Sequence, residues 1–107
     1  MTRQLDVSVV ICAHTAARWD VLLQAVASLE TQTIPPREIL LVIDHNPEML
    51  ERVREELPGV TALENTGTRG TSGARNTGIT AAGGAIVAFL DDDALAAPDW
   101  IEQLLSG

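Results

Sequence analysis

Short apolar runs alternate with helix-like segments along this chain, and the alternation constrains the fold more than any single motif does. Four runs predict strands, at residues 7–12, 38–44, 60–63 and 85–90. The last run is apolar throughout, which is typical of a strand buried on both faces of a sheet. The segments that separate and follow these runs predict helices at residues 19 to about 32, 46–57, 72–82 and 98–105.

A strand followed by a helix, repeated four times, predicts an α/β fold with a Rossmann-like parallel sheet. The connections should be right-handed crossovers, with helices on both faces of the sheet. We expect about four parallel strands in the order 3-2-1-4. A chain of 107 residues is long enough for one core and no more, so residues 1–107 should form a single domain.

Three consecutive acids, Asp91, Asp92 and Asp93, follow the fourth apolar run. Carboxylates this close repel one another, and each disfavours ionisation of its neighbours. The repulsion is tolerable if the side chains point into water, or if a divalent cation lies among them. Mg²⁺ and Mn²⁺ prefer carboxylate and phosphate oxygens. The triplet alone fits either a solvated turn or a cation site, and its place after a buried strand favours the cation site.

The other predicted strands also end in segments with polar side chains: residues 12–15, residues 44–46 and the glycine-rich loop at 65–73. Parallel strands end at one edge of a sheet, and ligands bind there. Arg75, one turn into its predicted helix, offers a bidentate phosphate contact. A nucleotide diphosphate with its metal would suit the carboxylates, the loop and the helix N-termini.

Weaker interpretations stay open for several of these residues. Asp44 either contributes to the site or caps the turn at residues 46–47, and Arg75 either binds phosphate or forms a surface ion pair. His14 and His45 are more typical of solvated or hydrogen-bonded loop residues than of metal ligands.

The charge of the chain excludes several classes of protein. The formal net charge is −8, which argues against a nucleic-acid surface. All seven basic residues are Arg. The absence of Lys excludes a P-loop lysine, a Schiff-base lysine and the lysine of a phosphoacceptor receiver site.

The expected location follows from two further observations. The single cysteine, Cys12, cannot form an internal disulfide, which favours a reducing compartment, and it ends an apolar run as a buried, inert thiol would. Residues 1–6 lack a signal-peptide pattern, and no apolar stretch approaches about 20 residues. We expect no membrane span and a cytoplasmic protein, held at the inner face of a membrane only if further parts of the chain bind there.

Taken in order, these segments resemble family 2 glycosyltransferases of the GT-A fold. The resemblance covers nearly all 107 residues, and the order and spacing of its segments make it specific. It is carried by residues 7–12, 28–33, 38–44, 70–78, 85–93 and 98–100.

The resemblance implies transfer of a sugar from a nucleotide-diphosphate sugar to an acceptor hydroxyl, usually with Mg²⁺ or Mn²⁺. The aspartates resemble the DXD element of the family, in which Asp93 would ligate the metal and Asp91 or Asp92 would reach the ribose. Asp44 falls in the acidic pair that binds the base or ribose. Arg75 falls in an Ala-Arg-Asn element that lines the nucleotide pocket.

Two departures from the family pattern bear on the base. Ala13, His14 and Thr15 stand where the family usually has Thr-Tyr-Asn or similar, and His45 replaces one acid of the pair. The choice between UDP, GDP and another nucleotide therefore stays open. No catalytic residue is identifiable, because the family carries its general base in an acceptor-binding half. We expect the N-terminal donor-binding half of a longer enzyme, inactive alone, whose acceptor is a saccharide, lipid or protein.

Two other classes of protein are alternatives. A receiver-like signalling module needs an acidic pair after its first strand and a lysine late in the chain, and this sequence has neither. A nucleotidyltransferase of similar fold typically has a glycine-rich basic loop after its first strand, where Arg18 is the nearest basic residue.

Overall fold

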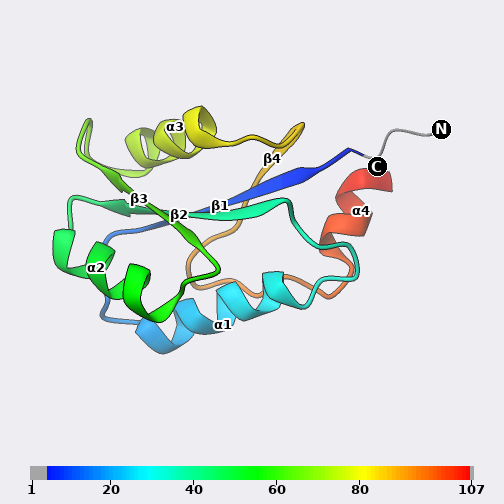
Figure 1. Ribbon diagram of the computed structural model, residues 1–107, viewed down its shortest axis with the longest axis horizontal. Coiled ribbons are helices and arrows are strands. Elements are labelled where there is room, and N and C mark those ends of the chain that lie inside the picture. Colours follow the sequence, from blue (N-terminus) through cyan, green and yellow to red (C-terminus); the bar gives the residue numbers. More distant parts are fainter. Residues whose placement is uncertain (1–4, 107) are drawn as a thin grey trace.

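The computed structural model describes residues 5–106, which form a parallel sheet flanked by helices (Figure 1). Residues 1–4, which were among those used to predict where the protein is located, lie outside the described part. The elements are β1 (Val7–Ala13), α1 (Trp19–Glu30), β2 (Glu38–Asp44), α2 (Pro47–Glu56), β3 (Thr61–Asn65), α3 (Thr71–Ala81), β4 (Ile86–Phe89) and α4 (Trp100–Ser106).

The sheet has the order β3-β2-β1-β4, and every pair of neighbours is parallel. β1 lies in the middle and pairs with β2 from Ser8↔Glu38 to Ala13↔Ile43. Its other edge pairs with the shorter β4. The predicted fold class, an α/β protein with a Rossmann-like sheet of order 3-2-1-4, is therefore confirmed.

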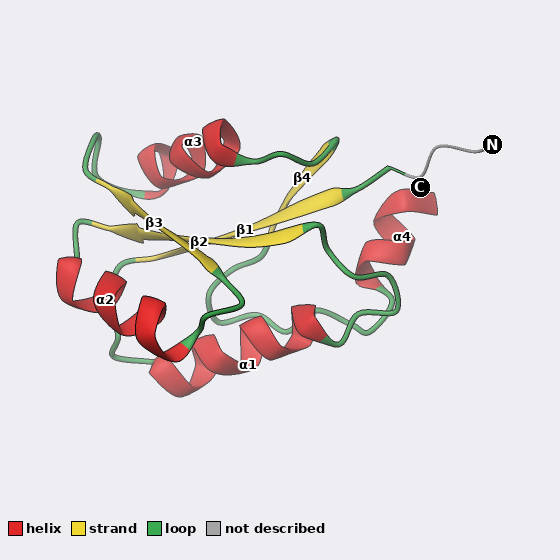
Figure 2. Cartoon of the chain, viewed as in Figure 1, coloured by secondary structure: helices red, strands yellow, loops and turns green. Residues whose placement is uncertain are grey.

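Helices cover both faces of the sheet, as Figure 2 shows, with α3 on one face and α1 and α2 on the other. Side chains alternate along β1, so Val9 and Ile11 belong to the larger core and Val10 to the smaller core beneath α3. Gly78 lets α3 approach closely, because a Cβ at this position would lie 2.6 Å from a methyl group of Val10. No helix between residues 5 and 106 is long and apolar enough to cross a membrane.

Two details of the predicted strands are wrong. β4 is not buried on both faces: Ala88 is buried, but Phe89 is 37% exposed. The reason is that α3 packs mainly against β1, β2 and β3 and leaves the edge strand β4 partly uncovered. β3 runs to Asn65 instead of ending at residue 63, because its pairing with β2 continues to Asp44↔Asn65. The other predicted boundaries hold to within two residues.

Candidate functional site

The carboxyl edge of the sheet contains two adjoining cavities, and every residue proposed for the site lines one or both. Cys12, His14 and Thr71 border both cavities. The first cavity, of about 450 Å³, is also lined by Ala13, Asp44, His45, Arg69, Gly70 and Ala74. The second, of about 240 Å³, is also lined by Val10, Arg18, Arg75, Phe89, Leu90, Asp91, Asp92 and Asp93.

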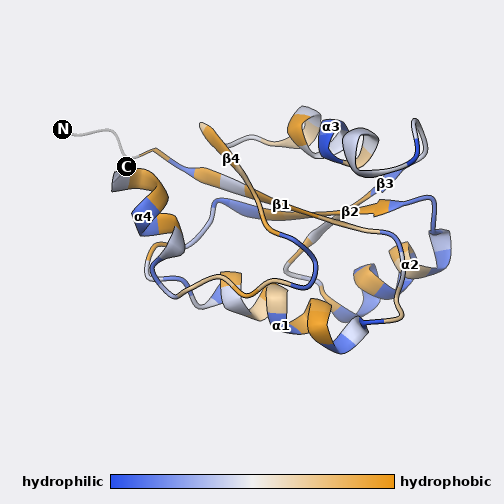
Figure 3. Ribbon diagram, turned by 180° about the vertical axis from the view of Figure 1, so that it is seen from behind, coloured by the Kyte–Doolittle hydropathy of each residue, from blue (hydrophilic) through white to orange (hydrophobic). Residues whose placement is uncertain are grey.

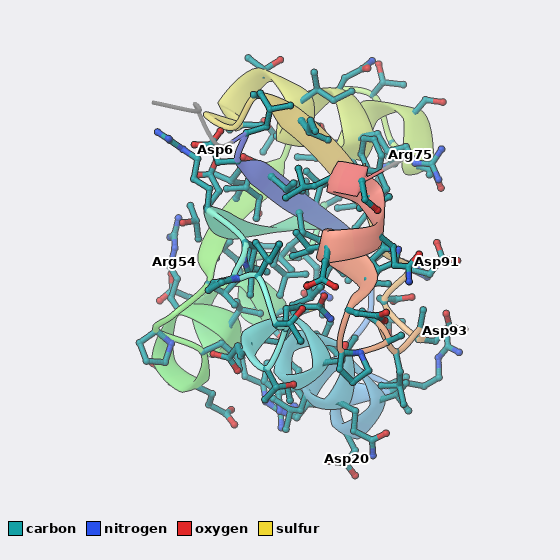
Figure 4. All side chains as sticks on the ribbon, turned by 90° about the vertical axis from the view of Figure 1, so that its right-hand side faces the viewer. Asp6, Asp20, Arg54, Arg75, Asp91 and Asp93 are labelled. Atoms are coloured by element: carbon teal, nitrogen blue, oxygen red, sulfur yellow. The ribbon has the colours of Figure 1, made fainter. Side chains whose placement is uncertain are left out.

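The three aspartates lie in the turn that follows β4, where the backbone N–H of Ala94 donates to the carbonyl oxygen of Asp91. Asp91 and Asp93 are exposed and Asp92 is half-buried. Figure 3 shows this hydrophilic turn directly after the hydrophobic β4. In Figure 4, Asp91 and Asp93 lie on the same side of the molecule as Arg75. The turn thus presents its carboxylates to the second cavity.

Asp93 forms an ion pair with Arg18, at 3.3 Å between Nη1 and Oδ2. The two side chains are 58% and 50% exposed, and an ion pair this exposed holds its partners weakly. Within residues 5–106, no group of three or more His, Cys, Asp or Glu side chains could hold a metal ion. Mg²⁺ and Mn²⁺ commonly bind through one or two carboxylates plus substrate phosphates. The donor set therefore suits a cation shared with a phosphorylated ligand and does not form an all-protein cage.

Asp44 ends β2 at the border of the first cavity, and two donors fix its carboxylate. The backbone N–H of Gly70 donates to Oδ2 at 2.9 Å, and Nδ2 of Asn65 donates to Oδ1 at 2.8 Å. The Gly70 N–H is the main cause that lowers the pKa of Asp44 below 3.8. The capping alternative is wrong, because Asn46 itself accepts from the N–H of Met49 at the start of α2.

Both histidines behave as hydrogen-bonded or solvated loop residues, as expected. Nε2 of His45 lies 2.9 Å from the carbonyl oxygen of Gly67, a distance at which an Nε2–H donates. The φ of His45 is 51°, a left-handed conformation that is uncommon outside glycine. His14 is exposed at the junction of the two cavities, and its carbonyl oxygen accepts from Nδ2 of Asn46.

Arg75 and Cys12 face the second cavity from α3 and β1. The guanidinium of Arg75 lies 5.2 Å from the centre of the Phe89 ring, and within residues 5–106 Arg75 has no ion-pair partner, so the surface ion-pair alternative is not supported. Cys12 is half-buried, and desolvation raises the pKa of its thiol. A thiol that stays protonated agrees with the expected inert role, although its burial is incomplete.

Sequence reasoning missed two residues of the first cavity region. Asn65 is buried behind Asp44, and Arg69 lines the cavity from the glycine-rich loop. The available signal for Asn65 was its position: it follows an apolar run and precedes a Thr-Gly pair. Arg69 carried no signal, because a charged residue in a polar loop is ordinarily solvated.

Comparison with known proteins places this chain in a family. The sequence profile named Glycosyl transferase family 2 matches residues 8–106. A glucosyl-dolichyl phosphate glucuronosyltransferase of Haloferax volcanii is 36% identical over 104 residues, covering 94% of this chain and 33% of that protein. The succinoglycan biosynthesis protein ExoO of Rhizobium meliloti is 31% identical, over 94% of this chain and 29% of that protein. The chain thus spans about a third of the length of these relatives.

Solved structures show the same fold. TarS of S. aureus (residues 1–349), determined in complex with UDP, matches with a TM-score of 0.74 and 20% identity. The match covers 95% of this chain and 31% of that one. The mannosyltransferase PcManGT of Pyrobaculum calidifontis, determined with GDP-Man and Mn²⁺, also matches with a TM-score of 0.74, at 25% identity. It covers 98% of this chain and 32% of the other.

Proposed function

Because the chain belongs to glycosyl transferase family 2, we propose that it binds the nucleotide-diphosphate sugar that serves as donor in glycosyl transfer. In the whole protein, the sugar would pass to an acceptor hydroxyl that other parts of the protein hold and activate. Neither the receiver-like module nor the nucleotidyltransferase has a specific observation in its favour.

The two adjoining cavities at the carboxyl edge carry this proposal. The first has the size and the polar border, with Asp44, that a nucleoside needs. The second places the cationic side chains of Arg18 and Arg75 near the three aspartates. A diphosphate between them would meet two guanidinium groups, but it would also be repelled by the carboxylates unless a cation intervened.

Asp93 is the residue we propose to hold that cation, Mg²⁺ or Mn²⁺, with Asp91 or Asp92 near the ribose. The cation, when bound, neutralises charge on the diphosphate leaving group. Arg18 competes with it for Asp93, and the exposed ion pair is weak enough to be displaced. The Mn²⁺ and GDP-Man of PcManGT, and the UDP of TarS, support this ligand class by analogy.

Calorimetric titration with UDP and GDP, with and without Mn²⁺, tests the proposal. We expect one of the nucleotides to bind in the presence of Mn²⁺, and Asp93→Ala to weaken that binding about a hundredfold. The matched control is Asp6→Ala, which removes a partly exposed aspartate at the other end of the sheet and should change Kd less than about twofold. Binding unaffected by Asp93→Ala contradicts the metal assignment, and no binding of either nucleotide contradicts the function.

A second variant separates the nucleotide from the metal. Asp44→Ala should weaken nucleotide binding more than Mn²⁺ binding, because Asp44 lines the first cavity whereas Asp93 lines the second. Equal losses for the two ligands would refute the assignment of Asp44 to the nucleotide.

A further inference from the structure

Asn65 is a buried polar residue at the end of β3, only 3% exposed, and it borders neither cavity. A polar side chain in such a place is costly unless all of its hydrogen-bonding groups are satisfied. Asn65 meets this condition, and its partners are parts of the candidate site.

The amide of Asn65 fills its whole hydrogen-bonding capacity. Its Nδ2 donates to Oδ1 of Asp44 and to the carbonyl oxygen of Thr68, both at 2.8 Å. Its Oδ1 accepts from the N–H of Gly67 at 3.3 Å and from the hydroxyl of Thr77 at 3.1 Å, whose single proton is shared with the carbonyl oxygen of Gly73 at 3.0 Å. Two donors and two acceptor positions are all that an amide offers. One side chain therefore joins β2, the glycine-rich loop and α3.

The loop between β3 and α3 packs closely around this amide. The backbone N–H of His45 donates to the carbonyl oxygen of Asn65, which fixes the start of the loop. A Cβ at Gly73 would collide with the carbonyl oxygen of Thr68 and would lie 3.1 Å from Nδ2 of Asn65. The loop therefore packs directly against the first turn of α3, and Asn65 occupies the space beneath it.

The loop between β3 and α3 also contacts Asp44 directly. The N–H of Gly70 donates to Oδ2 of Asp44, while Asn65 holds Oδ1. Gly70 and its neighbour Arg69 form one wall of the first cavity, and Asp44 lies at the same cavity. One buried amide thus contacts both the Asp44 carboxylate and the loop that forms the wall.

We propose that Asn65 is a positioning residue of the nucleotide site, which couples the Asp44 carboxylate to the Arg69–Gly70 wall so that the two form one preorganised surface. This inference rests on the proposed function. A preorganised surface binds a ligand without the cost of ordering a loop at the moment of binding. Asn65 itself does not touch the ligand.

The test compares two buried polar residues at opposite ends of the sheet. Asn65→Ala removes the coupling, and Ser8→Ala removes the hydroxyl that joins Glu38 to the N–H of Gly84. Both variants should unfold at lower temperature than the parent protein. Calorimetry with UDP and GDP in the presence of Mn²⁺ should show Kd about tenfold higher for Asn65→Ala and changed less than about twofold for Ser8→Ala. Titration with Mn²⁺ alone should be unchanged in both.

Two NMR measurements distinguish positioning from lost stability. In Asn65→Ala, the amide of Gly70 should exchange faster and the pKa of Asp44 should rise, because donors to the carboxylate are lost or loosened. Ser8→Ala should change neither. Thr77→Val, which removes a single contact to the amide, should have a smaller effect in the same direction and serves if Asn65→Ala does not fold.

The outcomes separate this inference from the proposed function. If the parent protein binds neither nucleotide, the proposed function fails, while Gly70 exchange and the Asp44 pKa still test the coupling. If the parent binds and Asn65→Ala binds equally well, or if Asn65→Ala and Ser8→Ala weaken binding equally, the positioning role is overturned.

Discussion

At the amino end of the sheet, the carboxylates of Asp6 and Glu38 are held by protein donors, whereas at the carboxyl end those of Asp91 and Asp93 border an open cavity. Asp6 accepts from Arg37 at 2.8 Å and from the N–H of Ala85 at 2.9 Å. Glu38 accepts from the Ser8 hydroxyl and the N–H of Gly83, whereas within residues 5–106 the aspartate turn forms one ion pair, which is exposed. We call Asp6, Ser8, Arg37, Glu38 and residues 83–85 the amino-end network.

The difference shows that the number of protein donors, more than the number of acids, separates a structural carboxylate from one that is free for a ligand. The amino-end network joins the start of β4 to β1 and β2, and each of its carboxylates accepts two hydrogen bonds from protein donors. The aspartate turn keeps its oxygens accessible. Asp44 is intermediate, because two donors orient it while it still lines a cavity.

The largest effect on stability should come from filling space in the amino-end network. In Gly84→Ala, the new Cβ would lie 2.7 Å from the Ser8 hydroxyl and 2.8 Å from the backbone nitrogen of Ser8. Because Ser8 belongs to β1 in the middle of the sheet, its backbone cannot shift to relieve the contact. We expect a loss of about 2–3 kcal/mol in the free energy of unfolding, measured by urea denaturation. Gly67→Ala is the matched change in the loop at the other end, where the nearest atom is 3.6 Å away, and should cost less than about 0.5 kcal/mol. Equal losses would break the contrast between the two ends.

Removing a hydroxyl should have a smaller effect in the same direction. Ser8 is fully buried, donates to Glu38 at 2.6 Å and accepts from the N–H of Gly84 at 2.8 Å. Ser8→Ala leaves both partners short of a hydrogen bond, so the free energy of unfolding should fall by about 1–2 kcal/mol. Ser72→Ala, at an exposed position of α3, should change it by less than about 0.5 kcal/mol. A loss in Ser8→Ala no larger than that in Ser72→Ala would mean that water replaces the network at little cost.

The sequence predicted the strands of the sheet and the edge at which the candidate site lies, because apolar periodicity and parallel topology determine where strands end. The alternating runs predicted parallel strands, and parallel strands bring Asp44 and the aspartate turn to one edge of the sheet. These inferences need only the path of the chain.

The hydrogen bonds that distinguish the two ends could not be predicted in the same way. Ser8 and Glu38 are 30 residues apart, and Asp44 and Asn65 are 21 apart, so nothing local in the sequence pairs them. Asn65 was assigned to a loop because residues 64–73 are polar and rich in glycine. The exposure of Phe89 in β4 was missed for a related reason: an apolar run indicates burial but does not identify the neighbours that provide it.

Acid should weaken the amino-end network over a defined range of pH. Protein donors lower the pKa of Asp6 and Glu38 from values of 3.8 and 4.5, with the N–H groups of Ala85 and Gly83 as the largest causes. A folded-state pKa below the unfolded value gives stability that is present above about pH 4.5 and is lost as the pH falls through the folded pKa. Glu38→Gln should therefore be less stable at pH 7, and its loss of stability between pH 5 and pH 3 should be shallower than that of the parent. A parallel pair of curves, measured by urea denaturation across this range, would contradict the assignment.

The smallest effect on stability should come from the two ion pairs, which differ in what their carboxylates do. Arg37 and Asp6 lie 2.8 Å apart and are 50% and 43% exposed, and Arg18 and Asp93 lie 3.3 Å apart and are 58% and 50% exposed. Asp6 has a backbone donor as well, whereas Asp93 borders the second cavity. Arg18→Gln should change the free energy of unfolding by less than about 0.5 kcal/mol, because an exposed pair contributes little. It should raise the affinity for Mn²⁺ alone by about two- to threefold, because a competing cation is removed from Asp93. Arg37→Gln should leave Mn²⁺ affinity unchanged, since Asp6 keeps its backbone donor and belongs to the other end of the sheet. If both variants changed the affinity for Mn²⁺ equally, the change would reflect net charge alone. The result would then contradict a specific Mn²⁺ site at the carboxyl end of the sheet.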